Sequence, residues 1–126
     1  MSERIERFEV SGTPTIQVRL GSGSVRFVEG TDGTVVVRLD GKKSFIERFR
    51  VEQSSDLIVV EPETGRRLSG GSARVTIETG TAPEVQARVG SSDIVAGIGL
   101  AALQVDFASG DVRVHDVSGD LTARGA

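Results

Sequence analysis

Residues 85–94, VQARVGSSDI, recur eighteen residues later as LQVDFASGDV at residues 103–112. In both copies, apolar residues alternate with polar ones over five positions, and a segment containing Ser and Gly and ending in Asp follows. Alternation with a period of two is typical of a β-strand with one buried face, whereas Ser, Gly and Asp favour turns. A third copy begins at Leu121 and Ala123. The repeat therefore predicts units of strand, turn and strand, whose apolar faces are covered by neighbouring units.

The same alternation extends along most of the chain. It occurs at residues 16–20, 25–27, 35–39, 49–51 and 75–77, and only residues 42–48 suggest a helix, which would be short. We therefore predict an all-β fold of stacked β-strand repeats, similar to a β-solenoid or single-stranded β-helix, with a repeat of about 18 residues in the C-terminal half.

A left-handed hexapeptide β-helix has coils of the same length, but it needs an aliphatic residue at every sixth position. The series Leu103, Ser109, His115 and Leu121 does not provide one. We therefore do not favour that variant.

The length of 126 residues is enough for one domain with its own core. We divide it into N-terminal strands at residues 1–61, a mobile loop at 62–73, and regular repeats at 74–126. The last unit contains only its first strand. We therefore expect an open C-terminal edge that is prone to self-association, because an unpaired strand edge is a template for another strand.

The composition argues against several classes of protein. Cysteine is absent and His115 is the only histidine, which excludes disulfides, thiolate metal sites and clusters of histidine ligands. Alternation places His115 on the face opposite Val112 and Val114, so we expect it to be exposed to solvent rather than catalytic. We predict that the protein is not an enzyme and has no catalytic, cofactor-binding or metal-binding residues. The net charge of -3 argues against binding to nucleic acid.

The sequence also contains no membrane signal. Residues 1–7 are charged and lack an apolar segment. The longest uncharged run, between Asp93 and Asp106, has twelve residues, fewer than the roughly 20 needed to span a bilayer. We therefore expect a cytoplasmic protein without membrane insertion.

Three aspartates, Asp56, Asp93 and Asp111, follow Ser-Ser or Ser-Gly and are predicted to occupy equivalent turn positions. Stacked in a column, their carboxylates would form a weak site for a divalent cation, since such ions take several oxygen ligands. The simpler interpretation, which we prefer, is that each aspartate caps a tight turn.

Residues 94–103, IVAGIGLAAL, are apolar at positions where the next unit is polar: Val95 replaces Arg113. A strand that is apolar on both faces is typically covered on both sides. One cover is expected from residues near Phe45 and Ile46, the other from a partner subunit, in which case arginine at position 95 would weaken assembly. The predicted interface residues, including those of the open edge, are Ile94, Val95, Ile98, Leu100, Leu121 and Ala123.

Residues 108–121, ASGDVRVHDVSGDL, resemble the bacterial putative-adhesin family of β-strand-repeat proteins, also called toastrack domains. Residues 8–10 and 18–25 resemble the usual start of that family, and the likeness is strongest from residue 75 to residue 125. The resemblance implies a single-sheeted or β-helix-like stack and links to adhesion and envelope stress. It implies no catalytic residues.

We therefore predict a non-enzymatic interaction module, a homo-oligomer or a module that docks a protein partner, acting through the faces and edges of its β-repeats. The alternative is an adhesin-like module that binds a cation or a glycan through turn carboxylates such as Asp93 and Asp111. The absence of Trp and Tyr counts against glycan binding by ring stacking. No cofactor is predicted, and the sequence identifies no small-molecule ligand.

Overall fold

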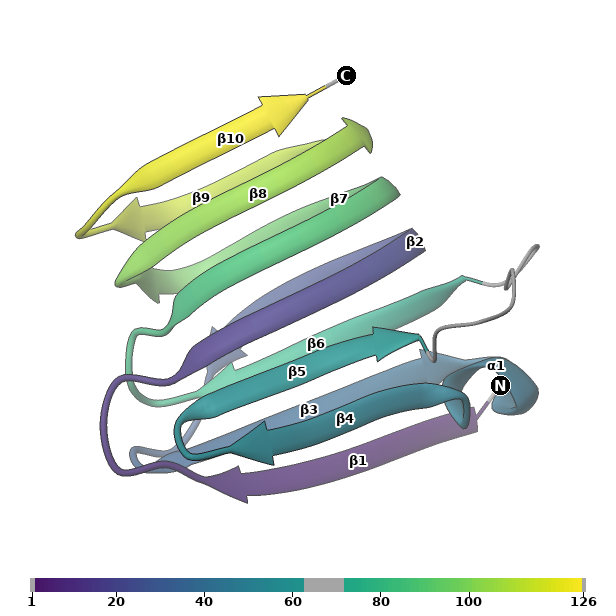
Figure 1. The fold of residues 1–126 in the computed structure, drawn as a ribbon, viewed down its shortest axis with the longest axis horizontal. Coiled ribbons are helices and arrows are strands. Elements are labelled where there is room, and N and C mark those ends of the chain that lie inside the picture. The colour runs from purple at the N-terminus through teal and green to yellow at the C-terminus, as the bar shows by residue number, and fades with distance from the viewer. Residues whose placement is uncertain (1, 63–71, 126) are drawn as a thin grey trace.

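The computed structural model describes residues 2–62 and 72–125, and it confirms the prediction of an all-β chain (Figure 1). Within those residues the only helix is α1, Lys43–Ile46, inside the segment 42–48 that the sequence indicated. The predicted loop at 62–73 lies outside the described residues except at its two ends. The strands are β1 (Ser2–Glu9), β2 (Thr15–Glu29), β3 (Thr34–Gly41), β4 (Phe49–Ser54), β5 (Leu57–Pro62), β6 (Ala73–Thr79), β7 (Glu84–Leu100), β8 (Ala102–Ser109), β9 (Val112–Val117) and β10 (Leu121–Gly125).

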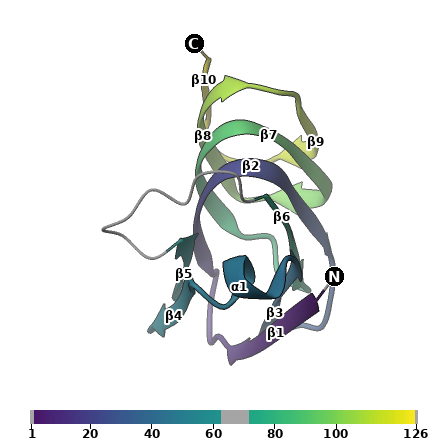
Figure 2. The same cartoon turned by 90° about the vertical axis from the view of Figure 1, so that its right-hand side faces the viewer.

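The strands form one open sheet that folds over into two layers (Figures 1 and 2). The long strands β2 and β7 run through both layers and pair with each other in both. Residues 15–18 of β2 also pair with β5, and residues 23–29 pair with β6. The first layer therefore contains β4, β5, the first parts of β2 and β7, β8 and β10. The second layer contains β1, β3, β6, the second parts of β2 and β7, and β9.

The pattern of buried residues reveals the corner between the layers. In the first part of β2, Ile16, Val18 and Leu20 are buried, whereas in the second part Val25 and Phe27 are. Residues 20 and 25 would face opposite sides of a straight strand, so the strand must turn between them to keep both sets inside. The sequence indicated separate strands joined by turns here and at residues 90–93. That prediction is wrong, because β2 and β7 each continue through their corner.

Glycine allows neighbouring strands to approach closely at this corner. Gly23 has φ +128°, and a Cβ atom there would lie 1.9 Å from the carbonyl oxygen of Ala73. Gly110 has φ +117°, and a Cβ atom there would lie 2.1 Å from the carbonyl oxygen of Ser92. Residues with a side chain rarely adopt such a positive φ, and backbone atoms already occupy the space that a Cβ would need.

The parallel ladders join residues at the spacing of the sequence repeat. β7 pairs with β8 through Val85 and Leu103, and β8 pairs with β10 through Leu103 and Leu121. Both pairs are eighteen residues apart, so equivalent residues of successive repeats lie side by side. β2 joins the same ladder through Ile16 and Val85 although the two residues are far apart in the chain.

The end of the sheet that contains β1 is covered. β1 pairs antiparallel with β3, and α1 packs against both (Figure 2). Phe45 and Ile46 of α1 are buried, and the Arg4 guanidinium donates hydrogen bonds to the carbonyl oxygens of Ile46 (3.2 Å) and Phe49 (2.7 Å). The expectation that this segment covers residues 94–103 is wrong, because α1 packs on β1 and β3, which β6 and β2 separate from β7 in the strand order.

Candidate functional site

The end of the sheet opposite α1 is open. Within the described residues, β10 pairs only with β8 and β9 pairs only with β7, so each has one unpaired edge (Figure 1). The two edges lie one in each layer. Together they form what we call the open end, β9 and β10.

The apolar side chains of the open end are less buried than their equivalents one repeat earlier. Ile94 and Ala96 of β7 are buried, but their partners on β9, Val112 and Val114, are only half-buried. Leu103 of β8 is 1% exposed, whereas its partner Leu121 on β10 is 60% exposed. Among the described residues, the inward-facing rows of β9 and β10 are therefore less covered than those of β7 and β8.

The open end also lacks the usual protection of an edge strand. Inward-pointing charges and prolines discourage further pairing at an edge. On β10 the inward positions are Leu121 and Ala123, and the charged Arg124 faces outward with Thr122. On β9, Arg113 and His115 are exposed on the outer face, as predicted for the histidine.

The predicted interface residues fall into three groups. Leu121 and Ala123 are exposed on β10, and Val95 and Ile98 of β7 are half-buried. Ile94 and Leu100 are instead core residues, 0% and 1% exposed, because the alternation after the corner in β7 points them inward. Only the first two groups present side-chain surface to a partner.

Asp93 and Asp56 each accept a hydrogen bond from the backbone of another segment rather than from their own turn. The Asp93 carboxylate accepts a hydrogen bond of 2.9 Å from the backbone N–H of Asp111, its equivalent one repeat later. Asp56 is not equivalent to them, so that prediction is wrong. It lies in the hairpin turn between β4 and β5 and accepts a hydrogen bond from the backbone N–H of Ser11 at 3.0 Å. In the described part of the chain, no three His, Cys, Asp or Glu residues gather as metal ligands.

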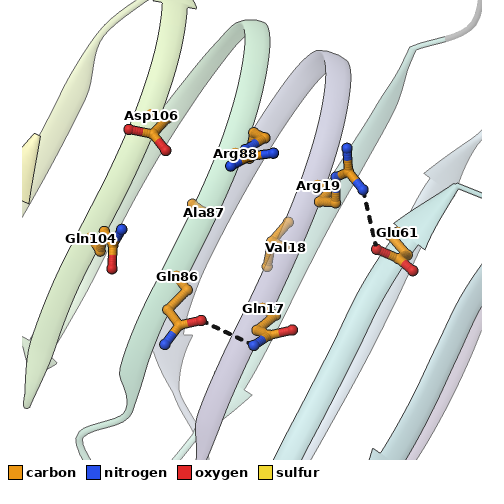
Figure 3. Close-up of a pocket in the computed structure, with 9 residues that line it drawn as sticks. All are labelled: Gln17, Val18, Arg19, Glu61, Gln86, Ala87, Arg88, Gln104 and Asp106. Atoms are coloured by element: carbon orange, nitrogen blue, oxygen red, sulfur yellow. Dashed lines mark hydrogen bonds and ion pairs between the residues drawn. The ribbon is translucent and has the colours of Figure 1, made fainter. Parts of the chain in front are cut away.

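A polar trough lies on the outer face of the first layer, and sequence reasoning missed it (Figure 3). It has a volume of about 220 Å³ and crosses β5, β2, β7 and β8. The side-chain Nε2 of Gln17 donates a hydrogen bond of 3.0 Å to the side-chain Oε1 of Gln86. The guanidinium of Arg19 lies 4.0 Å from the carboxylate of Glu61. The sequence did contain a signal, since IQVRLG at residues 16–21 has glutamine and arginine at the same positions as VQARVG at residues 85–90, and glutamine recurs at residue 104. The polar side chains of the trough are Gln17, Arg19, Glu61, Gln86, Arg88, Gln104 and Asp106.

No protein-family model matches the chain, and no curated protein matches it. Among the residues described, no helix has both the length and the apolar character needed to cross a membrane. Solved structures do show its fold. A "putative cell adhesion protein" from Clostridium sporogenes has 15% identity and a TM-score of 0.63, with 86% of this chain and 58% of that chain covered.

Two further solved structures are from Parabacteroides. A "putative adhesin" from P. merdae has 11% identity and a TM-score of 0.65, covering 98% of this chain and 52% of that one. A "putative lipid binding protein" from P. distasonis has 12% identity and a TM-score of 0.59, covering 98% and 59%. The chain thus spans less than two thirds of these proteins. The likeness shows an all-β fold shared with adhesin-like proteins, in agreement with the resemblance seen in the sequence.

Proposed function

We propose that this chain is a non-enzymatic interaction module that self-associates through its open end. In this proposal residues 84–125 are successive coils of a β-solenoid, and β9 and β10 accept further strands as the next coil would. The comparisons are in keeping with an interaction module, since the three proteins are named for adhesion or lipid binding.

The half-buried inward row of the last repeat carries this proposal. Phe107, Val112, Val114 and Val117 are partly exposed although they pack against the core. With Leu121 they form apolar surface that continues the core to the outside of the molecule. Burial of such surface is worth about 25 cal/mol per Å² removed from water, which favours a partner that extends the stack.

A second copy of the chain meets the geometric requirement. A twofold axis at the open end, perpendicular to the layers, would pair β10 with β10 of the partner in antiparallel fashion, whereas β9, which ends its layer one strand earlier, would not reach its own copy. The inward residues Leu121 and Ala123 would then face the same residues of the partner. No charged side chain would be placed inside, because Arg113 and Arg124 lie on the outer faces.

Light scattering after size exclusion tests this proposal through Leu121→Lys. The wild type should have a defined multiple of 13.3 kDa that persists on dilution. The variant should be monomeric, because lysine would place an unpaired charge in the new interface. Its fold should persist, since residue 121 is already 60% exposed.

Ile5→Lys is the matched control. Ile5 is the other large exposed apolar residue among those described, 49% exposed, and it lies on β1 at the closed end. This variant should keep the wild-type mass. A wild type that is monomeric throughout, or an unchanged mass for Leu121→Lys, would contradict self-association at the open end.

A further inference from the structure

The polar trough on the first layer has an unusual order of charges (Figure 3). Crossing the strands from β5 to β10, the side chains are Glu61, Arg19, Arg88, Asp106 and Arg124. Charges alternate along this row except at its centre. There the in-register residues of β2 and β7 are both arginine.

This central arginine pair is incompletely neutralised. Like charges directly opposite on neighbouring strands are destabilising. Glu61 lies 4.0 Å from Arg19 but also forms an ion pair with Arg50. No carboxylate of the described residues lies within ion-pair distance of Arg88.

Arg38 on the second layer shows the usual arrangement of an outer-face arginine and a carboxylate. Its Nε donates a hydrogen bond to Glu78 at 2.6 Å, and this bond and the charge of Glu78 raise the pKa of the Arg38 guanidinium. Neither Arg19 nor Arg88 has so close a partner among the described residues, since Glu61 lies 4.0 Å from Arg19 and Asp106, in register with Arg88, is beyond ion-pair distance. An external anion beside the two arginines would restore the alternation of charge along the row.

The flanking residues restrict which anion fits. Glu61 and Asp106 stand on either side of the arginine pair, so a ligand with several negative charges would be repelled at both ends of the trough. A single carboxylate fits best, because a guanidinium presents two parallel N–H donors to its two oxygens.

The glutamine column beside the arginines supplies groups for hydroxyls. Gln17, Gln86 and Gln104 are in register on β2, β7 and β8. Each amide offers two N–H donors and one carbonyl acceptor, and the single bond between Gln17 and Gln86 uses only one of each. No aromatic side chain lines the trough, so a ligand must be held by polar contacts.

We propose that the trough binds a monoanionic sugar acid, with its carboxylate between Arg19 and Arg88 and its hydroxyls on the glutamine column. A second hollow of about 300 Å³ shares Arg19, Glu61 and Arg88 but lies on the side of the arginines away from the glutamine column, so the sugar is placed in the trough alone. This site is separate from the open end and does not depend on self-association.

The test is a titration of the ¹⁵N-labelled chain with D-glucuronate, followed by NMR. D-glucose is the neutral control, and acetate is the control for a carboxylate alone. Glucuronate should shift the backbone amides of residues 86–88, and both controls should bind at least about tenfold more weakly, or about 1.4 kcal/mol. An oligogalacturonate should bind no tighter than glucuronate, because its additional carboxylates meet Glu61 and Asp106.

Arg88→Gln and Arg19→Gln should each weaken glucuronate binding by about tenfold, the range of a lost charge-assisted hydrogen bond. The matched control is Arg26→Gln, because Arg26 is an exposed arginine on β2 but on the outer face of the second layer. It should leave the dissociation constant unchanged. The absence of glucuronate binding, equal binding of glucose or acetate, tighter binding of the oligogalacturonate, or an equal loss in all three variants would overturn the proposal.

Discussion

At the scale of single residues, glycine at the corner decides whether the two layers can form. Gly23 lies in register with Ser92 on β7 and Ala73 on β6, at the point where β2 turns from one layer to the other. A Cβ atom at position 23 would lie 1.9 Å from the Ala73 carbonyl oxygen. Two residues earlier, a Cβ at Gly21 would meet no atom within 4 Å. The corner therefore contains one glycine that the packing requires and one that it does not.

Gly23→Ala should therefore destabilise the protein strongly. The φ of +128° alone costs an L-residue about 1–2 kcal/mol, and the clash with Ala73 adds to that. Gly21→Ala should change the free energy of unfolding by no more than about 0.5 kcal/mol, as an unstrained surface change does. Urea unfolding of both variants, followed by circular dichroism, measures the difference. Equal midpoints for the two variants would show that the corner is not tightly packed.

Val95 shows how the structure changes a residue-scale expectation. On the outer face of the second layer it lies in register between Arg26 and Arg113. Val95→Arg would place three arginines side by side, and the repulsion in each adjacent pair would destabilise the fold by about 0.2–1 kcal/mol. We expect a lower melting temperature but a wild-type mass by light scattering, because the proposed contact is at the open end. Val95→Thr, which keeps the β-branch without the charge, is the control. Dissociation by Val95→Arg alone would locate the contact on this outer face instead.

At the scale of elements, the sequence predicted the strands and the register that follow from its short-range periodicity. Alternation with a period of two predicted the strands, and the eighteen-residue recurrence matches the register of β7, β8 and β10. Pairings between distant segments have no such period. β2 pairs with β7, and β1 extends the sheet antiparallel to β3, through contacts between segments far apart in the chain. The prediction that Asp56 is equivalent to Asp93 and Asp111 failed because a Ser-Ser-Asp segment occurs in a hairpin turn as readily as at a corner between layers.

The polar trough was missed because the repeat was not used to align distant strands. Its central pair, Arg19 and Arg88, comes from strands far apart in the chain, although residues 16–21 (IQVRLG) share the pattern of residues 85–90 (VQARVG). Outward arginines on a strand are usually hydrated surface residues, so neither position stands out alone. Only the register of β2 on β7 makes them neighbours. A site built across strands is visible once strand order is known.

At the scale of the whole molecule, the sheet has two different ends. At one end α1 packs on β1 and β3 and buries Phe45 and Ile46, although β1 and β4 are edge strands there; at the other end β9 and β10 leave apolar side chains half-buried or exposed. Between them, each parallel strand covers the apolar row of the strand before it. Stability in such an array is approximately a sum of terms for single repeats and for their nearest-neighbour interfaces. An additional repeat should therefore add stability if its register matches.

Duplication of residues 94–111 tests this expectation on the complete chain. The inserted segment has the eighteen-residue length that separates Ile94 from its ladder partner Val112, so every later strand keeps its register on an additional coil. The 144-residue product (126 plus 18) should show more β-structure by circular dichroism and a higher melting temperature than the parent. The control carries the same eighteen residues in shuffled order, which removes the alternation and the turn positions, and it should be no more stable than the parent. The same result for both insertions would mean that length, and not the stacking of equivalent residues, determines how this chain folds, and it would remove the basis for a further coil docking at the open end.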